Sequence, residues 1–353
     1  MNVIIINSLI ELKKYEKKWL TLENKVNLKY YSKFEYLKYW IDEVISKGNE
    51  LFIIAVDNGE EFCGIAPLYI EKRKAKFVEI KELKFIGSGD YFNFIVDESK
   101  KYNEIYKLIF NEIDKNSSRY DRVILNYIDF ESKLARYILM SEELSKSFNF
   151  LVEIPRLDFI KCQKLNISKN MKNYRNKLLK DSNYKMEIIN GDKIDDNLFK
   201  SIAKIHEEEQ KYLSNEKNRI NRYSILSEEV KGKVYNKLLV GNKNTIIFLL
   251  RDNTQEIIAY KICYFYENEY FEWNTGYNPK YSKYRPNNTL YIEIFNHLLN
   301  TEFKGVYDFG AGRYSWKYRW ANQSNFVYEY DKFYNTNFKI KLYNKLKAIK
   351  ELL

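Results

Sequence analysis

The same order of strand and helix patterns occurs twice in this 353-residue chain. The first half has a β-run at residues 51–56 that ends in Asp57-Asn58-Gly59, a sequence typical of a hairpin turn. The second half has a β-run at residues 245–251 that ends in Asp252-Asn253. In each half a returning strand, a third strand, a helix and a further strand follow. This recurrence indicates a tandem duplication of one α/β unit.

Hydrophobic periodicity predicts the elements of each half. In the first half we expect helices at 11–22 and 33–47, strands at 62–71 and 82–96 with a break at 87–90, a helix around 105–113 and a strand at 122–127. In the second half we expect helices at 170–180 and 198–212, strands at 256–267 and 270–277, a helix around 290–298, a strand at 306–309 and a final helix at 338–353.

Length and composition fit two α/β (α+β) domains, each a mixed sheet flanked by helices. Hydrophobic residues make up 45% of the chain and aromatic residues 17%, which excludes a disordered protein even though 30% of the residues are charged. We place the domains at 1–155 and 156–353.

The N-terminus has an apolar run without a basic region before it or a cleavage site after it, and no run reaches the roughly 18 apolar residues of a membrane span. We therefore expect a cytoplasmic protein.

The cysteines and the charge carry less information. Cys63, Cys162 and Cys263 are far apart, and the chain has 2 histidines, so neither a metal site nor a disulfide framework is expected. The formal net charge of +11 is compatible with a polyanionic partner such as tRNA, but the lysines are spread evenly along the chain. The basic helix at 170–180 is either a solvated surface helix or a contact with phosphates or with the other domain.

The segment 305–320, GVYDFGAGRYSWKYRW, combines a short strand with two glycines and a dense group of aromatic and cationic side chains. Asp308 lies in the strand, and Gly310 and Gly312 interrupt it, because glycine adopts backbone angles that other residues avoid. Trp316, Lys317 and Tyr318 follow. The segment is either an interface in which cations cover aromatic rings or the wall of a pocket.

Short motifs in both halves resemble the GNAT N-acyltransferase superfamily, and within it the CelD-type acetyltransferase family with a duplicated, Fem-like fold. In the second half they are Tyr174-Arg175-Asn176-Lys177, Leu198 with His206, residues 282–290 (SKYRPNNTL), and Asp308-Phe309-Gly310 with Gly312 and Lys317. In the first half they are residues 64–68 (GIAPL) and Phe85-Ile86-Gly87 with Asp90-Tyr91.

The resemblance implies a thioester donor, acetyl-CoA or another acyl-CoA, held in the second half. In such a fold the third strand diverges from the fourth and exposes backbone groups for the pantetheine arm, while the next helix N-terminus binds the pyrophosphate. The implied donor-binding residues here are Tyr277, Lys283, Arg285, Asn287, Asn288 and Thr289. The loop departs from the family pattern because it has no glycine between Gly276 and Gly305. An acyl carrier protein or an aminoacyl-tRNA therefore stays open as donor.

Acyl transfer to an amine needs a group that takes a proton from the ammonium and donors for the thioester oxygen and the leaving thiolate. Glu272 and Asp308 are the expected bases, and both should face one cleft. Tyr318, Tyr277 and Lys317 are candidate donors, and Lys317 could equally anchor an anionic acceptor. The expected acceptor-binding residues are Asp90, Tyr91, His206 and Trp316. Each of Glu272, Asp308 and His206 also has an ordinary structural interpretation. Glu272 could be an exposed strand residue, and Asp308 a carboxylate that only forms structural hydrogen bonds. His206 could be a core or capping histidine.

Three functions are therefore considered. The first is an N-acyltransferase that moves an acyl, expected to be acetyl, group from a CoA-type thioester to an amine of a sugar, amino acid or peptide. The second is a Fem-like transferase that uses aminoacyl-tRNA. The third is a catalytically silent double domain that binds a glycan or a partner. The loop of the first half has Asp97, Glu98 and Lys100, which suits pyrophosphate poorly, so that half is expected to be acceptor-binding or degenerate.

Overall fold

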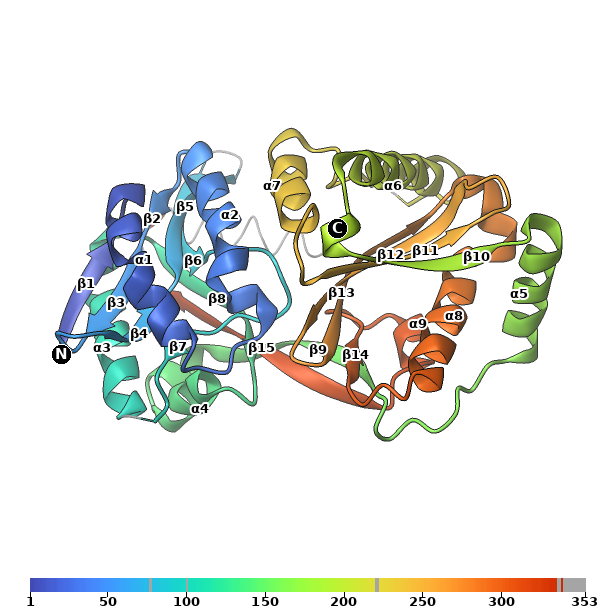
Figure 1. Ribbon diagram of the computed structural model, residues 1–353. Coiled ribbons are helices and arrows are strands. Elements are labelled where there is room, and N and C mark those ends of the chain that lie inside the picture. Colours follow the sequence, from blue (N-terminus) through green and yellow to red (C-terminus); the bar gives the residue numbers. More distant parts are fainter. Residues whose placement is uncertain (76–77, 100, 220–221, 335–337, 339–353) are drawn as a thin grey trace. The chain divides into compact units, whose positions relative to one another are not determined.

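The computed structural model describes residues 1–75, 78–99, 101–219, 222–334 and Phe338. The chain divides into two compact units (Figure 1). Unit 1 comprises Met1–Val152 and the chain from Asn325 onward, and unit 2 comprises Glu153–Ser324. The first boundary is close to the expected one at 155/156, whereas the residues after Ser324, which we expected in the second domain, group with the first unit.

Unit 1 is a mixed α/β unit in which the strands form two groups. Its elements are β1 (Asn2–Ile6), α1 (Leu9–Glu23), α2 (Phe34–Ser46), β2 (Glu50–Leu51), β3 (Ile53–Asp57), β4 (Phe62–Ala66), β5 (Leu68–Ala75), β6 (Val78–Phe85), β7 (Ile95–Val96), α3 (Tyr102–Lys115), β8 (Arg122–Asp129), α4 (Lys133–Met140) and β15 (Gln323–Phe333). The strand orders are β1-β3-β4-β7 and β15-β8-β6-β5-β2. The predicted helices and the hairpin of β3 and β4 are confirmed.

The strand predicted at 62–71 is two strands that belong to different sheets. Pro67 separates them, because proline has no N–H to donate to a strand ladder. β4 pairs with β3, and β5 pairs with β6. The strand predicted at 82–96 is likewise divided, and Gly87 has a φ of 119° at the break. Unit 1 therefore contains a second hairpin that hydrophobic periodicity does not distinguish from a continuous strand.

Unit 2 repeats the mixed sheet with helices on both faces. Its elements are the part of β9 (Phe148–Asp158) from Glu153 onward, α5 (Lys169–Ser182), β10 (Lys185–Asn190), α6 (Asp196–Glu216), α7 (Glu229–Leu239), β11 (Thr245–Arg251), β12 (Ile257–Tyr266), β13 (Glu269–Tyr277), α8 (Pro286–Asn300), β14 (Val306–Asp308) and the short α9 (Ser315–Tyr318). The strand order is β10-β11-β12-β13-β14-β9. The hairpin, third strand, helix and fourth strand predicted here are confirmed, whereas β10 and α7 were not predicted.

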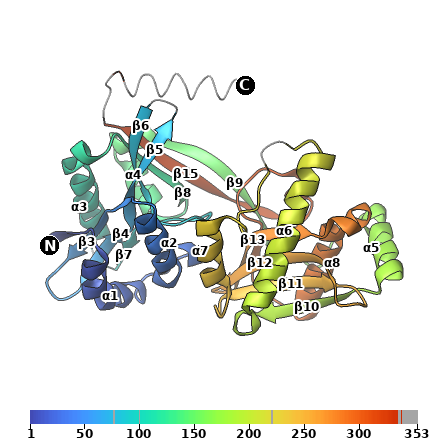
Figure 2. The same cartoon turned by 90° about the horizontal axis from the view of Figure 1, so that it is seen from above.

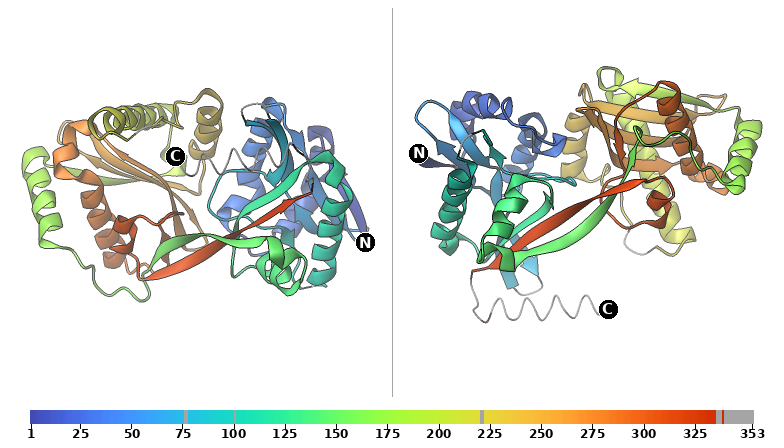
Figure 3. Two further views of the ribbon diagram at one scale, coloured as in Figure 1. Left: turned by 180° about the vertical axis from the view of Figure 1, so that it is seen from behind. Right: turned by 90° about the horizontal axis from the view of Figure 1, so that it is seen from below.

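Helices α6 and α8 cover opposite faces of the unit 2 sheet. The front view and the view from behind place α6 on one side of the strands and α8 with α9 on the other (Figures 1 and 3), and the view from above shows α6 crossing in front of the sheet (Figure 2). Asp195 caps α6 by accepting a hydrogen bond from the N–H of Leu198. We call the two sides of this sheet the α6 face and the α8 face.

The third and fourth strands of unit 2 diverge as expected. Parallel pairing joins β13 to β14 at Glu269, Tyr270 and Phe271, and β14 then ends at Asp308 while β13 continues to Tyr277. We call the segment of β13 from 272 to 277 the splayed segment. Its backbone edge on the β14 side extends beyond the end of that strand.

Two further expectations concern the ends of the chain and membranes. The helix expected at 338–353 lies outside the described residues apart from Phe338. In the part of the chain that the structure describes, every helix is too short or too polar to cross a membrane.

Candidate active site

The N-terminus of α8 follows the splayed segment after a short 3-10 helix at Pro279–Tyr284 and has the features of an anion site. Arg285 has a φ of 52°, the left-handed conformation that glycine usually provides, and Pro286 starts the helix. Within the described residues no side chain caps this terminus. The hydroxyl of Thr289, in the first turn, is buried without a hydrogen-bond partner among the described residues. Pro286 has no N–H, and the N–H of Asn288 donates to the carbonyl of Arg285 at 3.0 Å. The positive end of the helix dipole and the buried hydroxyl are therefore the features that can attract a phosphate here.

The predicted donor-binding cations lie beside this terminus on exposed positions. The guanidinium of Arg285 lies 4.8 Å from the centre of the Tyr174 ring of α5, and the ammonium of Lys283 lies 4.8 Å from that of Tyr284. The amide oxygen of Asn287 accepts a hydrogen bond from Thr275 of the splayed segment at 3.5 Å. Asn288 is half-buried in the same first turn. The structure thus gathers Lys283, Arg285, Asn287, Asn288 and Thr289 around one helix end.

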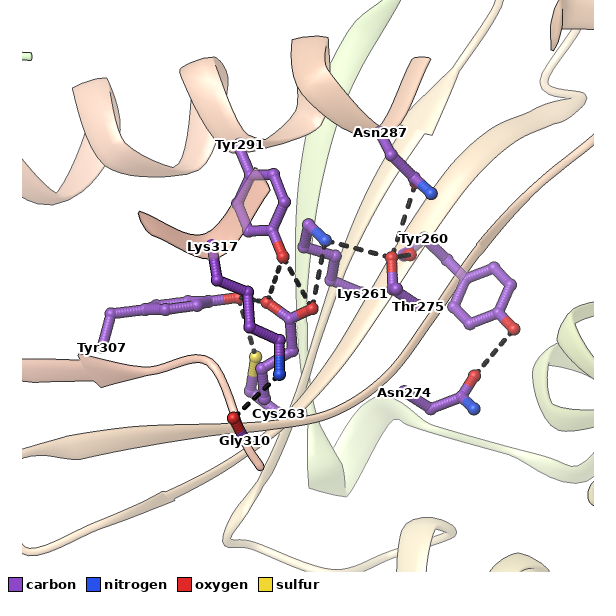
Figure 4. Close-up of polar contacts among 11 residues, drawn as sticks. Tyr260, Lys261, Cys263, Asn274, Thr275, Asn287, Tyr291, Tyr307, Gly310 and Lys317 are labelled. Atoms are coloured by element: carbon purple, nitrogen blue, oxygen red, sulfur yellow. Dashed lines mark hydrogen bonds and ion pairs between the residues drawn. The ribbon is translucent and has the colours of Figure 1, made fainter. Parts of the chain in front are cut away.

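A buried polar cluster lies under the splayed segment on the α8 face (Figure 4). Both carboxylate oxygens of Glu272 accept from the Tyr291 hydroxyl at 2.7 Å, and one also accepts from the Tyr307 hydroxyl at 2.7 Å. The ammonium of Lys261, which is 0% exposed, lies 3.3 Å from Glu272 and donates to Thr275 at 3.0 Å. It also lies 3.5 Å from the centre of the Tyr291 ring. The cluster links β12, β13, β14 and α8.

Burial controls the protonation of this cluster. Loss of solvation lowers the pKa of Lys261, and the charge of Glu272 opposes this shift. Burial raises the pKa of Tyr291 and of Tyr307 well above the usual range, and raises that of Cys263. The two tyrosines therefore stay protonated and act as donors to Glu272.

Glu272 and Asp308 lie on opposite faces of the sheet, which corrects the expectation that they share a cleft. Paired residues of neighbouring strands point to the same side, and successive residues alternate. Phe271 is paired with Asp308, and Tyr270 with Tyr307. Glu272 therefore shares the α8 face with Tyr307, whereas Asp308 points to the α6 face. The sequence could not reveal this relationship because it depends on the register between two strands.

Asp308 and Lys317 fix the loop that follows β14. Asp308 is 1% exposed, accepts a hydrogen bond from the N–H of Gly310 at 2.8 Å and lies 3.3 Å from the guanidinium of Arg156. The buried ammonium of Lys317 donates to the carbonyls of Gly310 and Ala311, both at 2.8 Å. Gly310 and Gly312 have φ values of 71° and 113°, the backbone angles expected of glycines that interrupt the strand.

The aromatic residues of this segment divide between the core and the surface. The Trp316 ring packs on Tyr291 at a centroid distance of 5.5 Å, and the Trp320 ring packs on Phe295 at 5.3 Å. The exposed Tyr318 donates its hydroxyl to Glu153 at 2.8 Å. The segment is therefore partly an aromatic interface with α8, the first of the two interpretations considered.

His206 and Glu209 lie on the α6 face. The ring of His206 is hydrogen-bonded to Ser224 at 2.8 Å and contacts Gln210 at 3.4 Å, and burial lowers its pKa to about 4. Glu209, which the sequence analysis did not single out, is 5% exposed and accepts a hydrogen bond from the N–H of Tyr277. A run of three glutamates, 207–209, in the middle of an amphipathic helix was the available signal, because the third falls on the apolar face.

The remaining predicted residues are found in separate places. Tyr277 is half-buried at the end of β13, and burial raises its pKa to about 12. Asp90 and the buried Tyr91 belong to unit 1, as do Asp97 and Glu98, whereas Lys100 lies outside the described residues. A cavity of about 890 Å³ lies between the chain at 159–167 and the C-terminal end of α8, at the other end of this helix from the predicted donor site.

Residues 167–318, all in unit 2, match the model of the acetyltransferase (GNAT) domain family. The solved structure of FemX has a TM-score of 0.59 at 10% identity, with 98% of this chain and 99% of that chain covered. L-PGS from Bacillus licheniformis has a TM-score of 0.57 at 14% identity, with 94% and 96% covered. A tandem GNAT protein from the clavulanic acid biosynthesis pathway has a TM-score of 0.51 at 8% identity, with 95% and 100% covered. No curated protein matches.

The family match places a GNAT-type acetyltransferase domain over the splayed segment, the α8 N-terminus and the loop after β14. The structural neighbours share the tandem fold along nearly the whole chain. The protein is therefore an acyltransferase built as a tandem α/β fold, and the alternative of a catalytically silent double domain is set aside.

Proposed function

We propose that this acyltransferase moves an acyl group, acetyl in the simplest case, from a CoA-type thioester to an amine of a sugar, amino acid or peptide. The observation that carries the proposal is the adjacency of the splayed segment and the N-terminus of α8. A thioester with a phosphorylated tail needs an extended groove for its amide-bearing arm and a cationic end for its phosphates. The CelD-type family is the proposed relative among GNAT proteins. Since CoA thioesters are cytoplasmic metabolites, we place the reaction in the cytoplasm.

In this proposal the donor lies along the splayed segment. Backbone N–H and C=O groups of residues 272–276 pair with the pantetheine amides, as a missing strand would, whereas the N–H of Tyr277 is bound by Glu209. The pyrophosphate lies at the first turn of α8, near the positive end of the helix dipole and the hydroxyl of Thr289. Arg285 and Lys283 add positive charge at an exposed position, and Asn287 closes the groove toward Thr275.

The residues around the end of β14 are proposed to keep the donor groove open. Glu272 holds β13, β14 and α8 together through the hydroxyls of Tyr291 and Tyr307. Asp308 and Lys317 hold the loop 310–312 from both sides, Asp308 through an N–H and Lys317 through two carbonyls. Tyr318 is exposed beside this loop, where its hydroxyl can return a proton to the leaving thiolate. Trp316, against Tyr291, borders the same region.

Calorimetric titration with CoA and with CoA lacking the 3′-phosphate tests the donor site. We expect CoA to bind in the titration and to raise the melting temperature of the protein. The variant Arg285→Gly should weaken binding, whereas Lys233→Ala, at an exposed position on α7 beside Glu229, should not. Failure of CoA, acetyl-CoA and longer acyl-CoA thioesters to bind at millimolar concentration would refute the proposal.

A second candidate donor is aminoacyl-tRNA, because α5, which packs against α8, exposes four lysines. Arg175 of α5 pairs with Glu293 of α8 at 2.6 Å, and Tyr174 lies under Arg285. The exposed lysines of this helix are Lys169, Lys172, Lys177 and Lys180. They form a cationic surface that could bind a nucleic acid backbone. Retention on tRNA that falls steeply with salt would favour this donor over CoA, and indifference to tRNA at low salt would exclude it.

A further inference from the structure

We propose that Glu209 of α6 accepts the proton that the acceptor ammonium loses before its nitrogen attacks the thioester. The inference rests on the proposed function and adds a catalytic residue to it. The donor arm occupies the splay from the α8 face, where the N-terminus of α8 lies. The acceptor then approaches the reacting carbonyl from the α6 face, and Glu209 is the buried carboxylate that α6 presents to the splayed segment.

Glu209 is held directly against the backbone of the splayed segment. Its carboxylate accepts the N–H of Tyr277. A Cβ placed on Gly276 would lie 2.7 Å from the Oε2 atom of Glu209 and 2.7 Å from the Tyr260 hydroxyl. Glycine at this position therefore lets the carboxylate approach the strand. The Tyr260 hydroxyl itself donates to Asn274 at 2.8 Å, so the polar groups of Glu209, Tyr260 and Asn274 share this face.

A β-bulge in β13 brings this arrangement about. Ile262 is paired with Asn274 but Cys263 with Glu272, so Trp273 is the additional residue. Glu272 points toward α8, where it meets Tyr291, and strict alternation would also turn residue 276 to that side. Because of the extra residue, Thr275 meets Asn287 of α8 and Gly276 meets α6. The bulge thereby places Glu209 across the strand from the donor groove.

The surroundings suit a proton acceptor better than those of the other two carboxylates. Glu272 has both oxygens bound by tyrosine hydroxyls, and Asp308 is paired with Arg156. The charged and titratable groups that act on Glu209 are Lys261 and Tyr260 of β12, Tyr277 of β13, and Arg219 and Arg222 after α6. Burial outweighs the three cations and raises the pKa of Glu209 to about 8. Such a group exchanges protons near neutral pH.

The proposed step is balanced in atoms and charge. The ammonium gives one proton to the Glu209 carboxylate, directly or through one water, and becomes a neutral amine. The amine nitrogen forms a bond to the thioester carbonyl carbon, and the carbon–sulfur bond breaks. The second proton of the nitrogen passes to the leaving thiolate, so the products are an amide and a free thiol. Glu209 then returns its proton to water.

The test compares Glu209→Gln with Glu208→Gln, which removes a charge from the exposed neighbouring position on the same helix. Turnover is followed as thiol release from acetyl-CoA with a panel of glucosamine, single amino acids and short peptides, from pH 6 to 10. We expect Glu209→Gln to lower kcat by roughly 100-fold or more, to leave CoA affinity unchanged and to abolish the rise of kcat toward alkaline pH. Glu208→Gln should behave as the unchanged chain.

The other outcomes distinguish this role from the proposed function. Turnover by Glu209→Gln at the original rate and with the original pH profile would overturn the role of Glu209 alone. Absence of turnover and of CoA binding in the unchanged chain would overturn the proposed function and this role with it. If Glu209→Gln does not fold, Glu209→Asp retains the carboxylate at a shorter reach. An altered pH profile in that variant supports the role, and an unaltered one contradicts it.

Discussion

The carboxylate of Glu209 occupies the space that a side chain on Gly276 would need. A Cβ at Gly276 would lie 2.7 Å from Oε2 of Glu209, closer than carbon and oxygen approach without displacement. We expect Gly276→Ala to destabilise the protein by about 1–3 kcal/mol through overpacking. Urea unfolding of Gly276→Ala, Glu209→Asp and the double variant measures this. The double variant should cost less than the sum of the two, and strict additivity would show that these residues do not interact.

Glu272 is expected to be one of the most costly residues to truncate in unit 2. Glu272→Ala leaves the Tyr291 hydroxyl buried without its acceptor and the Lys261 ammonium buried without its counter-charge, which should cost about 3–5 kcal/mol. The double variant Lys261→Met with Glu272→Gln removes both charges together and should cost less than Glu272→Ala. Denaturant midpoints of the unchanged chain and of the two variants decide this, and equal losses of stability in the two variants would contradict the coupling within the cluster.

Arg285 combines an unusual backbone conformation with a predicted phosphate contact, and two variants separate them. Arg285→Gly removes the side chain but suits the φ of 52°, whereas Arg285→Ala removes it and keeps the strain. Both should weaken CoA binding by about 1–3 kcal/mol, the range of a lost charge-assisted hydrogen bond. Calorimetry gives the affinities. Unchanged affinity in Arg285→Gly would show that the guanidinium does not contact the donor.

His206 should make the fold sensitive to acid. Burial lowers its pKa from 6.5 to about 4, so the unfolded chain binds a proton that the folded protein refuses. Stability is then retained above pH 6.5 and lost as the pH falls toward 4, by about 2–3 kcal/mol. Urea midpoints at pH 7 and pH 4.5 should differ less in His206→Gln than in the unchanged chain. The same pH dependence in both proteins would locate the effect elsewhere.

Glu209 should make the folded protein less stable at alkaline pH, whereas His206 makes it less stable at acid pH. Its pKa is raised from 4.5 to about 8, so the folded protein binds the proton more tightly than the unfolded chain. The associated stability is present below pH 4.5 and is lost as the pH rises through 8. Glu209→Gln cannot lose a proton, so its melting temperature should fall less between pH 6 and pH 9. An equal fall of the melting temperature in both proteins would contradict the raised pKa of Glu209.

Local patterns were sufficient to predict the elements around the site. The apolar spacing of α2 and α8, the Asp-Asn turns and the glycines after β14 are short-range signals, because helices and hairpins form between neighbours in sequence. The gathering of Arg285, Asn287 and Thr289 was predictable for the same reason, since all three belong to one helix end. The duplicated order was also sufficient to indicate the tandem fold.

The amino-acid sequence by itself determined the two α/β units, their principal helices and strands, and the cationic helix terminus. Only the tertiary structure decided which side chains meet across strands. The bulge at Trp273 turns Gly276 toward α6, the register of β13 with β14 sends Glu272 and Asp308 to opposite faces, and the tyrosines of α8 and β14 converge on one carboxylate. A shift of one residue in a strand reverses the face of every side chain that follows, and hydrophobic periodicity does not record such a shift when both faces of a sheet are buried.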